Sequence, residues 1–79
     1  MAEHDAVKTL DLKGLPCPMP VVRMSQEIGK VNVGEVIEVH TTDPGSLADF
    51  PAWAKSTGQE IVDTRQEDGL IRIFVKRNK

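Results

Sequence analysis

The segment Gly14-Leu15-Pro16-Cys17-Pro18-Met19-Pro20 places three prolines around the only cysteine of the chain. A thiolate is a nucleophile, and a helix N-terminus or a nearby cation favours this anionic form, as it would favour an anionic persulfide. Prolines in the first turn of a helix cost little because the N–H groups there have no helical acceptor. We therefore expect Cys17 to cap a helix that begins at Pro18, with its sulfur partly exposed and with the N–H groups of Cys17 and Met19 nearby.

Two cations flank this segment. Lys13 precedes it, and Arg23 lies in the second turn of the expected helix. A cation near a helix N-terminus interacts unfavourably with the helix dipole. The position of Arg23 therefore indicates a functional role, such as steering an anionic sulfur species or an acidic partner. With the dipole, these cations predict a thiol pKa below the free value of ~8.5. The alternatives are an ordinary surface arginine and a buried structural cysteine.

The sequence lacks the residues that a thiol enzyme needs beside its cysteine to act without a partner. With no second cysteine, the chain can form neither an internal disulfide nor a thioredoxin-type exchange pair, and a cysteine-rich metal site is excluded. A cysteine hydrolase also needs a base. His4 lies in the expected tail, and His40 lies with Glu38 on the outward face of an expected strand. An active thiolate without such partners suits a protein that carries a group delivered by another protein.

Composition and charge limit the classes of function. The 79 residues fit one small domain with one modest core, and 28% charged with 39% hydrophobic residues is typical of a globular protein. A net charge of −2 argues against direct nucleic-acid binding, although Arg72, Lys76, Arg77 and Lys79 form a basic C-terminal segment. No apolar run is long enough to span a membrane, and no signal-peptide pattern opens the sequence. A single cysteine favours the reducing cytoplasm.

Hydrophobic spacing predicts the elements that position Cys17. Lys8 to Leu12 reads as a short strand, and Val36 to Thr42 alternates as a second one with Ile37, Val39 and Thr41 inward. Between them, apolar residues recur at helical spacing, with a polar set on the opposite side. The apolar residues are Val21, Met24, Ile28 and Val31, and the polar ones are Arg23, Gln26, Glu27 and Lys30.

A second strand-to-helix junction follows at Asp43-Pro44-Gly45-Ser46, where Asp43 can cap the following N–H groups and Pro44 suits a first helical position. Pro51 should interrupt the helix, because a proline inside a helix removes a hydrogen bond and clashes with the preceding turn. We expect an irregular turn over residues 44–48, then a firmer helix that Asp49 caps and Gly58 ends. Phe50 and Trp53 should anchor this helix in the core.

The remaining sequence predicts two strands, Glu60 to Gln66 and Leu70 to Lys76, joined by a turn at Glu67-Asp68-Gly69, with Ile71, Ile73 and Val75 facing inward. The order is β-α-β-α-β-β. Right-handed crossovers place both helices on one face of a mixed four-stranded sheet, which leaves the other face largely open to water. The predicted fold is an α/β (α+β) two-layer sandwich. Residues 1–8 are expected to be a frayed tail and residues 9–79 a single domain.

Cys17-Pro18-Met19-Pro20, with its glycine-led loop and amphipathic helix, resembles the signature of the TusA (SirA-like) sulfur-carrier family. The Asp43-Pro44 junction and the stretch "DFPAWAKSTGQE" also match that family, so the resemblance covers Leu10 to Val75. It implies a sandwich like the C-terminal domain of translation initiation factor three, with the fourth strand between the second and the third. It further implies transfer of sulfane sulfur as a persulfide.

The resemblance implies that Cys17 is the carrier, that Pro18 and Pro20, with Gly14 opening the loop, frame it, and that Asp43 contacts partners. Lys13 and Arg23 would add supporting charge. No metal or other cofactor is expected. A cysteine desulfurase or a rhodanese would donate the sulfur, and a further relay protein would accept it, for tRNA thiolation or oxidative sulfur metabolism. Met19 departs from the tRNA-thiolation pattern, which has Glu between the two prolines.

Two other classes of function stay open from the sequence. One is an RNA- or ribosome-binding module, which only the analogy of fold suggests and which the acidic balance of charge opposes. The other is a redox-sensing thiol protein, which should oxidise readily at its cysteine.

Overall fold

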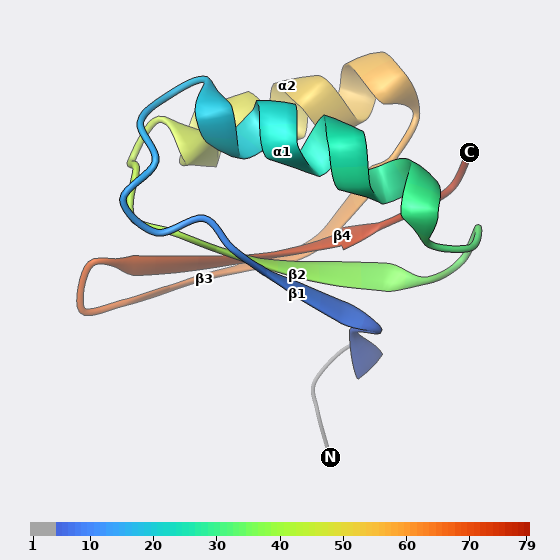
Figure 1. Cartoon of the computed structure of the whole chain (residues 1–79), viewed down its shortest axis with the longest axis horizontal. Coiled ribbons are helices and arrows are strands. Elements are labelled where there is room, and N and C mark those ends of the chain that lie inside the picture. The colour runs from blue at the N-terminus through green and yellow to red at the C-terminus, as the bar shows by residue number, and fades with distance from the viewer. Residues whose placement is uncertain (1–4) are drawn as a thin grey trace.

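The computed structural model describes residues 5–79 (Figure 1). The elements along the chain are β1 (Lys8–Asp11), α1 (Met19–Glu27), the short 3₁₀ helix η2 (Ile28–Lys30), β2 (Val36–Thr41), α2 (Ser46–Thr57), β3 (Glu60–Glu67) and β4 (Leu70–Lys76). Residues 1–4 of the expected tail lie outside the described residues, whereas Lys8 already pairs with Ile37 in the sheet. None of the helices in the described part has the length and apolar character needed to cross a membrane.

The strands form one sheet in the order β1-β2-β4-β3, in which β1 and β2 run parallel and the other neighbours run antiparallel. Both helices cover the same face of this sheet (Figure 1). The predicted α+β two-layer sandwich with a mixed sheet is therefore confirmed. Because β1 and β2 are parallel neighbours, the loops that leave their carboxyl ends emerge at the same edge of the sheet.

The core lies between the sheet and the helices. Alternate residues of β2 and β4 face it, and Ile37 pairs with Val75 while Val39 pairs with Ile73. These side chains are buried, as the alternation predicted, and Met24 of α1 and Phe50 of α2 pack on them from the helical layer. Full burial of such a side chain stabilises the fold by roughly 1.5–3 kcal/mol relative to exposure. This packing fixes both helices, and their N-termini, on the sheet.

The second helix corrects one expectation. α2 is a single helix from Ser46 to Thr57 with Pro51 inside it, and it ends at Gly58 as predicted. Proline removes only the bond that its own N–H would make to the carbonyl of Leu47, a residue that is 37% exposed on the surface. Phe50, next to this proline, is fully buried and holds the helix on the sheet. Packing therefore outweighs the local cost of the proline.

Glu27 corrects another expectation, because the sequence pattern places it on the solvated side of α1. Its side chain is only 8% exposed and forms ion pairs with Lys8 of β1 and Lys30 of η2. Hydrogen bonds from Lys8 and then Lys30 outweigh the effect of burial and lower the pKa of Glu27 from 4.5 to about 2. The ion pair with Lys8 links α1 to the first strand.

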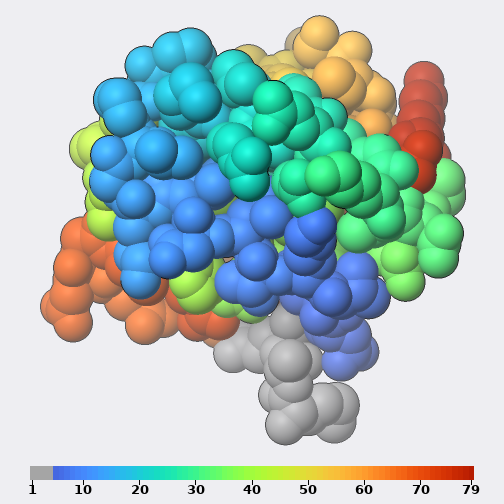
Figure 2. Space-filling view, in the orientation of Figure 1, coloured from blue at the N-terminus to red at the C-terminus, as the bar shows by residue number. Residues whose placement is uncertain are grey.

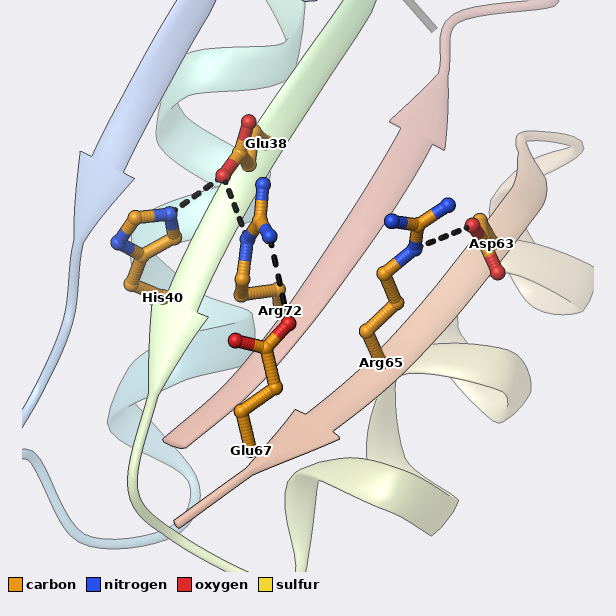
Figure 3. Close-up of polar contacts among 6 residues, drawn as sticks. All are labelled: Glu38, His40, Asp63, Arg65, Glu67 and Arg72. Carbon is orange, nitrogen blue, oxygen red and sulfur yellow. Dashed lines mark hydrogen bonds and ion pairs between the residues drawn. The ribbon is translucent and has the colours of Figure 1, made fainter. Parts of the chain in front are cut away.

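The sheet face away from the helices is less open than expected. Phe74 points to this face, opposite Glu38 of β2, and is fully buried. The guanidinium groups of Arg65 and Arg72 lie 6.0 and 5.5 Å from the centre of its ring. Figure 3 shows the polar contacts across this face, which are His40–Glu38, Glu38–Arg72, Arg72–Glu67 and Arg65–Asp63. The arginine side chains and their acidic partners thus cover the ring.

The hairpin between β3 and β4 is tighter than expected. Glu67 still belongs to β3, so the turn consists of Asp68 and Gly69 alone, with φ angles of +49° and +82°. Two successive positive φ angles are what a two-residue hairpin of the primed type requires. The hairpin lies at the same end of the molecule as the start of both helices (Figure 1).

Candidate functional site

Cys17 is exposed and lies just before α1. The helix begins one residue later than expected: Pro18 is the N-cap, Met19 and Pro20 are the first two helical residues, and the Cys17–Pro18 peptide is cis. The N–H of Met19 donates to the carbonyl of Pro16 at 2.9 Å, so it is not free for the sulfur, contrary to expectation. The sulfur therefore lies near the positive end of α1 but outside its first turn.

Hydrogen bonds hold the loop that carries Cys17 against the end of β2. The buried residue Leu12 donates its N–H to the carbonyl of His40 at 2.8 Å, and the N–H of Gly14 donates to Thr42 Oγ1 at 2.9 Å. Gly14 adopts a φ of +82°, which favours glycine over any other residue. Figure 2 shows this loop, in blue, on the surface at the end of the molecule where the β3–β4 hairpin also lies.

The loop brings Cys17 to the start of α2. Its Sγ lies 2.8 Å from Oδ2 of Asp49, so the thiol donates a hydrogen bond to this carboxylate. The sulfur and carboxylate oxygens of Asp43 and Asp49 all lie within 4.8 Å of one another. The sequence had indicated Asp43 as a site residue but had assigned Asp49 to helix capping. The sequence did contain a signal for the contact with Asp49. Both strand-to-helix junctions follow strands that were expected to be parallel neighbours, so the starts of both helices should lie at the same edge of the sheet.

These carboxylates overturn the predicted acidity of the thiol. The pKa of Cys17 is raised above that of a free cysteine, first by the hydrogen bond to Asp49, then by partial desolvation, and then by the charges of Asp49 and Asp43. Each of these effects favours the neutral thiol over the thiolate. The prediction of a lowered pKa was wrong because it counted the helix dipole and the cations but not the acidic residues of α2.

Asp43 has one oxygen without a partner. Its Oδ1 accepts the N–H of Gly45 at 3.3 Å, and its own N–H donates to Thr41 Oγ1 at 3.2 Å. The helix α2 itself begins at Ser46 with Gly45 as its N-cap and without a side-chain cap, so the expected cap by Asp43 and the expected first helical position of Pro44 were wrong. Oδ2 of Asp43 is buried and makes no hydrogen bond. A Cβ at Gly45 would lie 3.3 Å from this Oδ2 and 3.6 Å from Oδ2 of Asp49, so the glycine leaves room for both carboxylates.

The two predicted cations do not meet the sulfur. Nζ of Lys13 lies 4.0 Å from Oδ1 of Asp11, and the guanidinium of Arg23 donates to Gln26 at 3.4 Å. Neither contacts Cys17 in the described part of the chain. His40 lies on the sheet face away from the helices, where it contacts Glu38, so the expectation that it plays no part at the thiol agrees with its position (Figure 3).

Three large apolar side chains stay exposed on the two helices. Met19 and Val22 of α1 and Leu47 of α2 are among the large hydrophobic residues that stay exposed, at 37–39%. Leu47 also lines an open pocket of about 340 Å³ between the start of α2 and the β3–β4 hairpin, together with Thr42 and Pro44. Cys17 does not line this pocket. The thiol itself lies beside the carboxylates of Asp43 and Asp49.

One thiol and two carboxylates within 4.8 Å could in geometric terms hold a metal ion. The set mixes a soft sulfur ligand with hard oxygen ligands, which matches the usual preference of no single metal. The expectation of no metal at this site stays a prediction.

The arrangement of layers and the exposed thiol at the first strand-to-helix junction define a class of small thiol-bearing α+β domains. A SirA-like protein of Desulfitobacterium hafniense, known from its crystal structure, has the same fold: the TM-score is 0.79 at 23% identity, over 91% of this chain and 99% of that chain.

Residues 8–77 match the family described as Sulfurtransferase TusA, and the chain belongs to this family. It is 38% identical over 78 residues to the sulfur carrier protein TusA of Allochromatium vinosum, which covers 99% of this chain and 100% of that protein. It is 47% identical over 72 residues to YrkF of Bacillus subtilis, which covers 91% of this chain but 39% of YrkF. The chain therefore spans less than half of that longer relative.

Proposed function

We propose that the protein is a sulfur carrier that accepts sulfane sulfur on Cys17 as a persulfide and passes it to another protein. The observation that carries this proposal is the single cysteine, exposed at the first strand-to-helix junction of a TusA-family chain. The name of the Allochromatium vinosum relative, which matches over its whole length, supports the same function.

The transfer needs no oxidant. The Cys17 thiolate attacks the terminal sulfur of a persulfide on the donor, a new S–S bond forms at Cys17, and the S–S bond of the donor breaks. The donor leaves as a thiolate and takes up a proton in place of the one that Cys17 lost. One thiol and one persulfide thus give one persulfide and one thiol. An acceptor thiolate repeats the same steps with Cys17 as the donor.

The surroundings of Cys17 favour a carrier over a self-sufficient catalyst. In the described part of the chain, the side chain bonded to the thiol is Asp49, and no histidine or lysine contacts the sulfur. The raised pKa of Cys17 also argues against a thiol that reacts without a partner protein. It argues against a redox sensor as well, because sensor cysteines have low pKa values. We therefore assign the activation of the thiol to the partner protein.

We propose a cysteine desulfurase or a rhodanese as the donor, and a further relay protein as the acceptor. Met19, which starts α1 two residues after Cys17, is an exposed apolar residue that such partners can contact. The same residue stands where the tRNA-thiolation pattern has Glu, which argues against tRNA thiolation as the destination of the sulfur. The cytoplasm is the compartment in which a free thiol of this kind stays reduced.

The test is intact-mass analysis after incubation with a persulfide-loaded donor. We expect the protein to gain the mass of one sulfur atom and to lose it on treatment with a reductant. Cys17→Ser should gain nothing while it keeps its fold, and His40→Ala, which alters a residue on the other face of the sheet, should load like the unaltered protein. Loading of Cys17→Ser, or loss of loading in a folded His40→Ala, would contradict the carrier proposal.

A further inference from the structure

We propose that Asp49 and Asp43 determine which sulfur donors can load Cys17. They slow loading by free anionic sulfur compounds, such as thiosulfate and hydropolysulfide, and favour a protein-bound persulfide that brings a cationic side chain with it. This inference rests on the proposed function, because it names the partner chemistry of the same site.

The first step is the hydrogen bond between Cys17 and Asp49. Oδ2 of Asp49 accepts the thiol proton at an Sγ–Oδ2 distance of 2.8 Å. If the thiol loses that proton without any other change, a thiolate faces a carboxylate at hydrogen-bond distance, and the carboxylate of Asp43 is close by. Like charges at such a distance disfavour the ionised form. The free carrier therefore keeps Cys17 as a protonated, weakly nucleophilic thiol.

The second step is the lack of a compensating cation. No ion pair among the described residues includes Asp43 or Asp49, and Oδ2 of Asp43 is buried without any hydrogen-bond partner. The charged groups of the neighbouring elements have other contacts: Lys13 lies beside Asp11, and Arg23 donates to Gln26. Cys17 thus lies beside two carboxylates that have no counter-ion among the described residues, and a buried oxygen of one of them has no hydrogen bond.

The third step is the consequence for the donor. In water, two unit charges about 4 Å apart change a rate or an equilibrium roughly fivefold, and they do so in opposite directions for an anion and a cation. A free sulfur anion must approach against both carboxylates. A lysine or arginine beside the donor persulfide instead pairs with Asp43 or draws Oδ2 of Asp49 away from the thiol. Cys17 therefore loses its proton only in the complex with the donor, where the donor sulfur is next to it.

The test uses the isolated protein and two methanethiosulfonate reagents of similar size, one with a cationic trimethylammonioethyl group and one with an anionic sulfonatoethyl group. Both form a mixed disulfide with a thiolate, and intact mass gives the two rates. The ratio of the cationic to the anionic rate separates the effect of charge from the general reactivity of the thiol. We expect this ratio to be well above one, and to fall by up to about 25-fold in Asp49→Asn, because the removed charge acts about fivefold on each reagent and in opposite directions.

Matched variants keep the test decisive. Asp43→Asn retains an oxygen for the N–H of Gly45 and should lower the ratio in the same direction. Glu60→Gln removes one negative charge at the far end of α2, on the first residue of β3, and should leave the ratio unchanged. Thiolate absorbance against pH gives a second readout, in which Asp49→Asn should lower the thiol pKa while Glu60→Gln does not.

A ratio and a thiol titration that stay unchanged in folded Asp49→Asn and Asp43→Asn would overturn the inference. Neither measurement involves a persulfide, so that result would leave the sulfur-carrier proposal standing. Conversely, a protein that shows the expected ratios but never gains sulfur from a donor would contradict the carrier proposal alone. With hydropolysulfide as the probe, Asp49→Asn should load faster than the unaltered protein, and equal rates would overturn the claim that the carboxylates slow loading by anions.

Discussion

The conformation of Gly14 gives a prediction whose size follows from the structure. A Cβ at this residue would meet nothing within 4 Å, so Gly14→Ala creates no steric clash with the rest of the protein. Its φ of +82° nevertheless lies in the left-handed region, which costs a residue with a Cβ about 1–2 kcal/mol. The hydrogen bond from its N–H to Thr42 opposes relaxation of the loop. We therefore expect Gly14→Ala to lower the free energy of unfolding by about 1 kcal/mol.

Urea denaturation measures this change, and thermal unfolding should show a fall in Tm of about 4–8 °C for a domain of this size. Gly29→Ala is the matched control, since a Cβ at Gly29 also meets nothing within 4 Å and its φ is not in the left-handed region. That substitution should be neutral or stabilising, because alanine restricts the unfolded chain. A Gly14→Ala protein as stable as Gly29→Ala would refute the claim that the left-handed conformation constrains the Cys17 loop.

Three further predictions concern charge and helix contacts. The pKa of Glu27 is about 2 in the folded protein and below its ordinary 4.5, so its stabilisation is present above pH 4.5 and is lost as pH falls towards 2. Urea midpoints of Glu27→Gln should therefore vary less over that window than those of the unaltered protein. Arg23→Glu should slow sulfur transfer from a donor protein, and the loss should shrink as salt rises, because exposed charges are screened over ~8–10 Å. Trp53→Phe removes the hydrogen bond that Nε1 donates to Ser25 between the two helices. Calorimetry should show that the free energy of unfolding falls by about 1 kcal/mol, and an unchanged stability would show that this bond does not stabilise the fold.

The sequence predicts the layers of this fold well because the core is encoded in local spacing. Alternation in β2 and β4 and helical spacing in α1 identify the inward residues before any contact is known. The first helix begins at Met19 rather than at the predicted Pro18, since the N–H of Met19 donates to the carbonyl of Pro16 in a turn that precedes the helix. Pro51 suggested a break because local rules do not include the burial of Phe50, which keeps α2 on the sheet.

The chemistry of the site was predicted less completely because it depends on how the two helices pack. Cys17 and Asp49 are 32 residues apart, and only the docking of α2 beside α1 brings them into contact. Glu27 was misassigned for the same reason, as its partner Lys8 comes from the first strand. Phe74 was not among the expected core residues because it lies on the sheet face that was predicted to be open to water. The sequence pattern did not indicate that Arg65 and Arg72 cover its ring on that face.

The most direct test of the central claim follows one labelled sulfur atom. A donor protein loaded with radioactive sulfane sulfur is mixed with the carrier and then with an acceptor thiol, and the label is located on each protein without reductant. The account predicts that the label moves to the peptide containing Cys17, at no more than one sulfur atom per chain, and then leaves for the acceptor. Transfer from donor to acceptor at the same rate in the presence of Cys17→Ser, or label bound elsewhere on the chain, would contradict it.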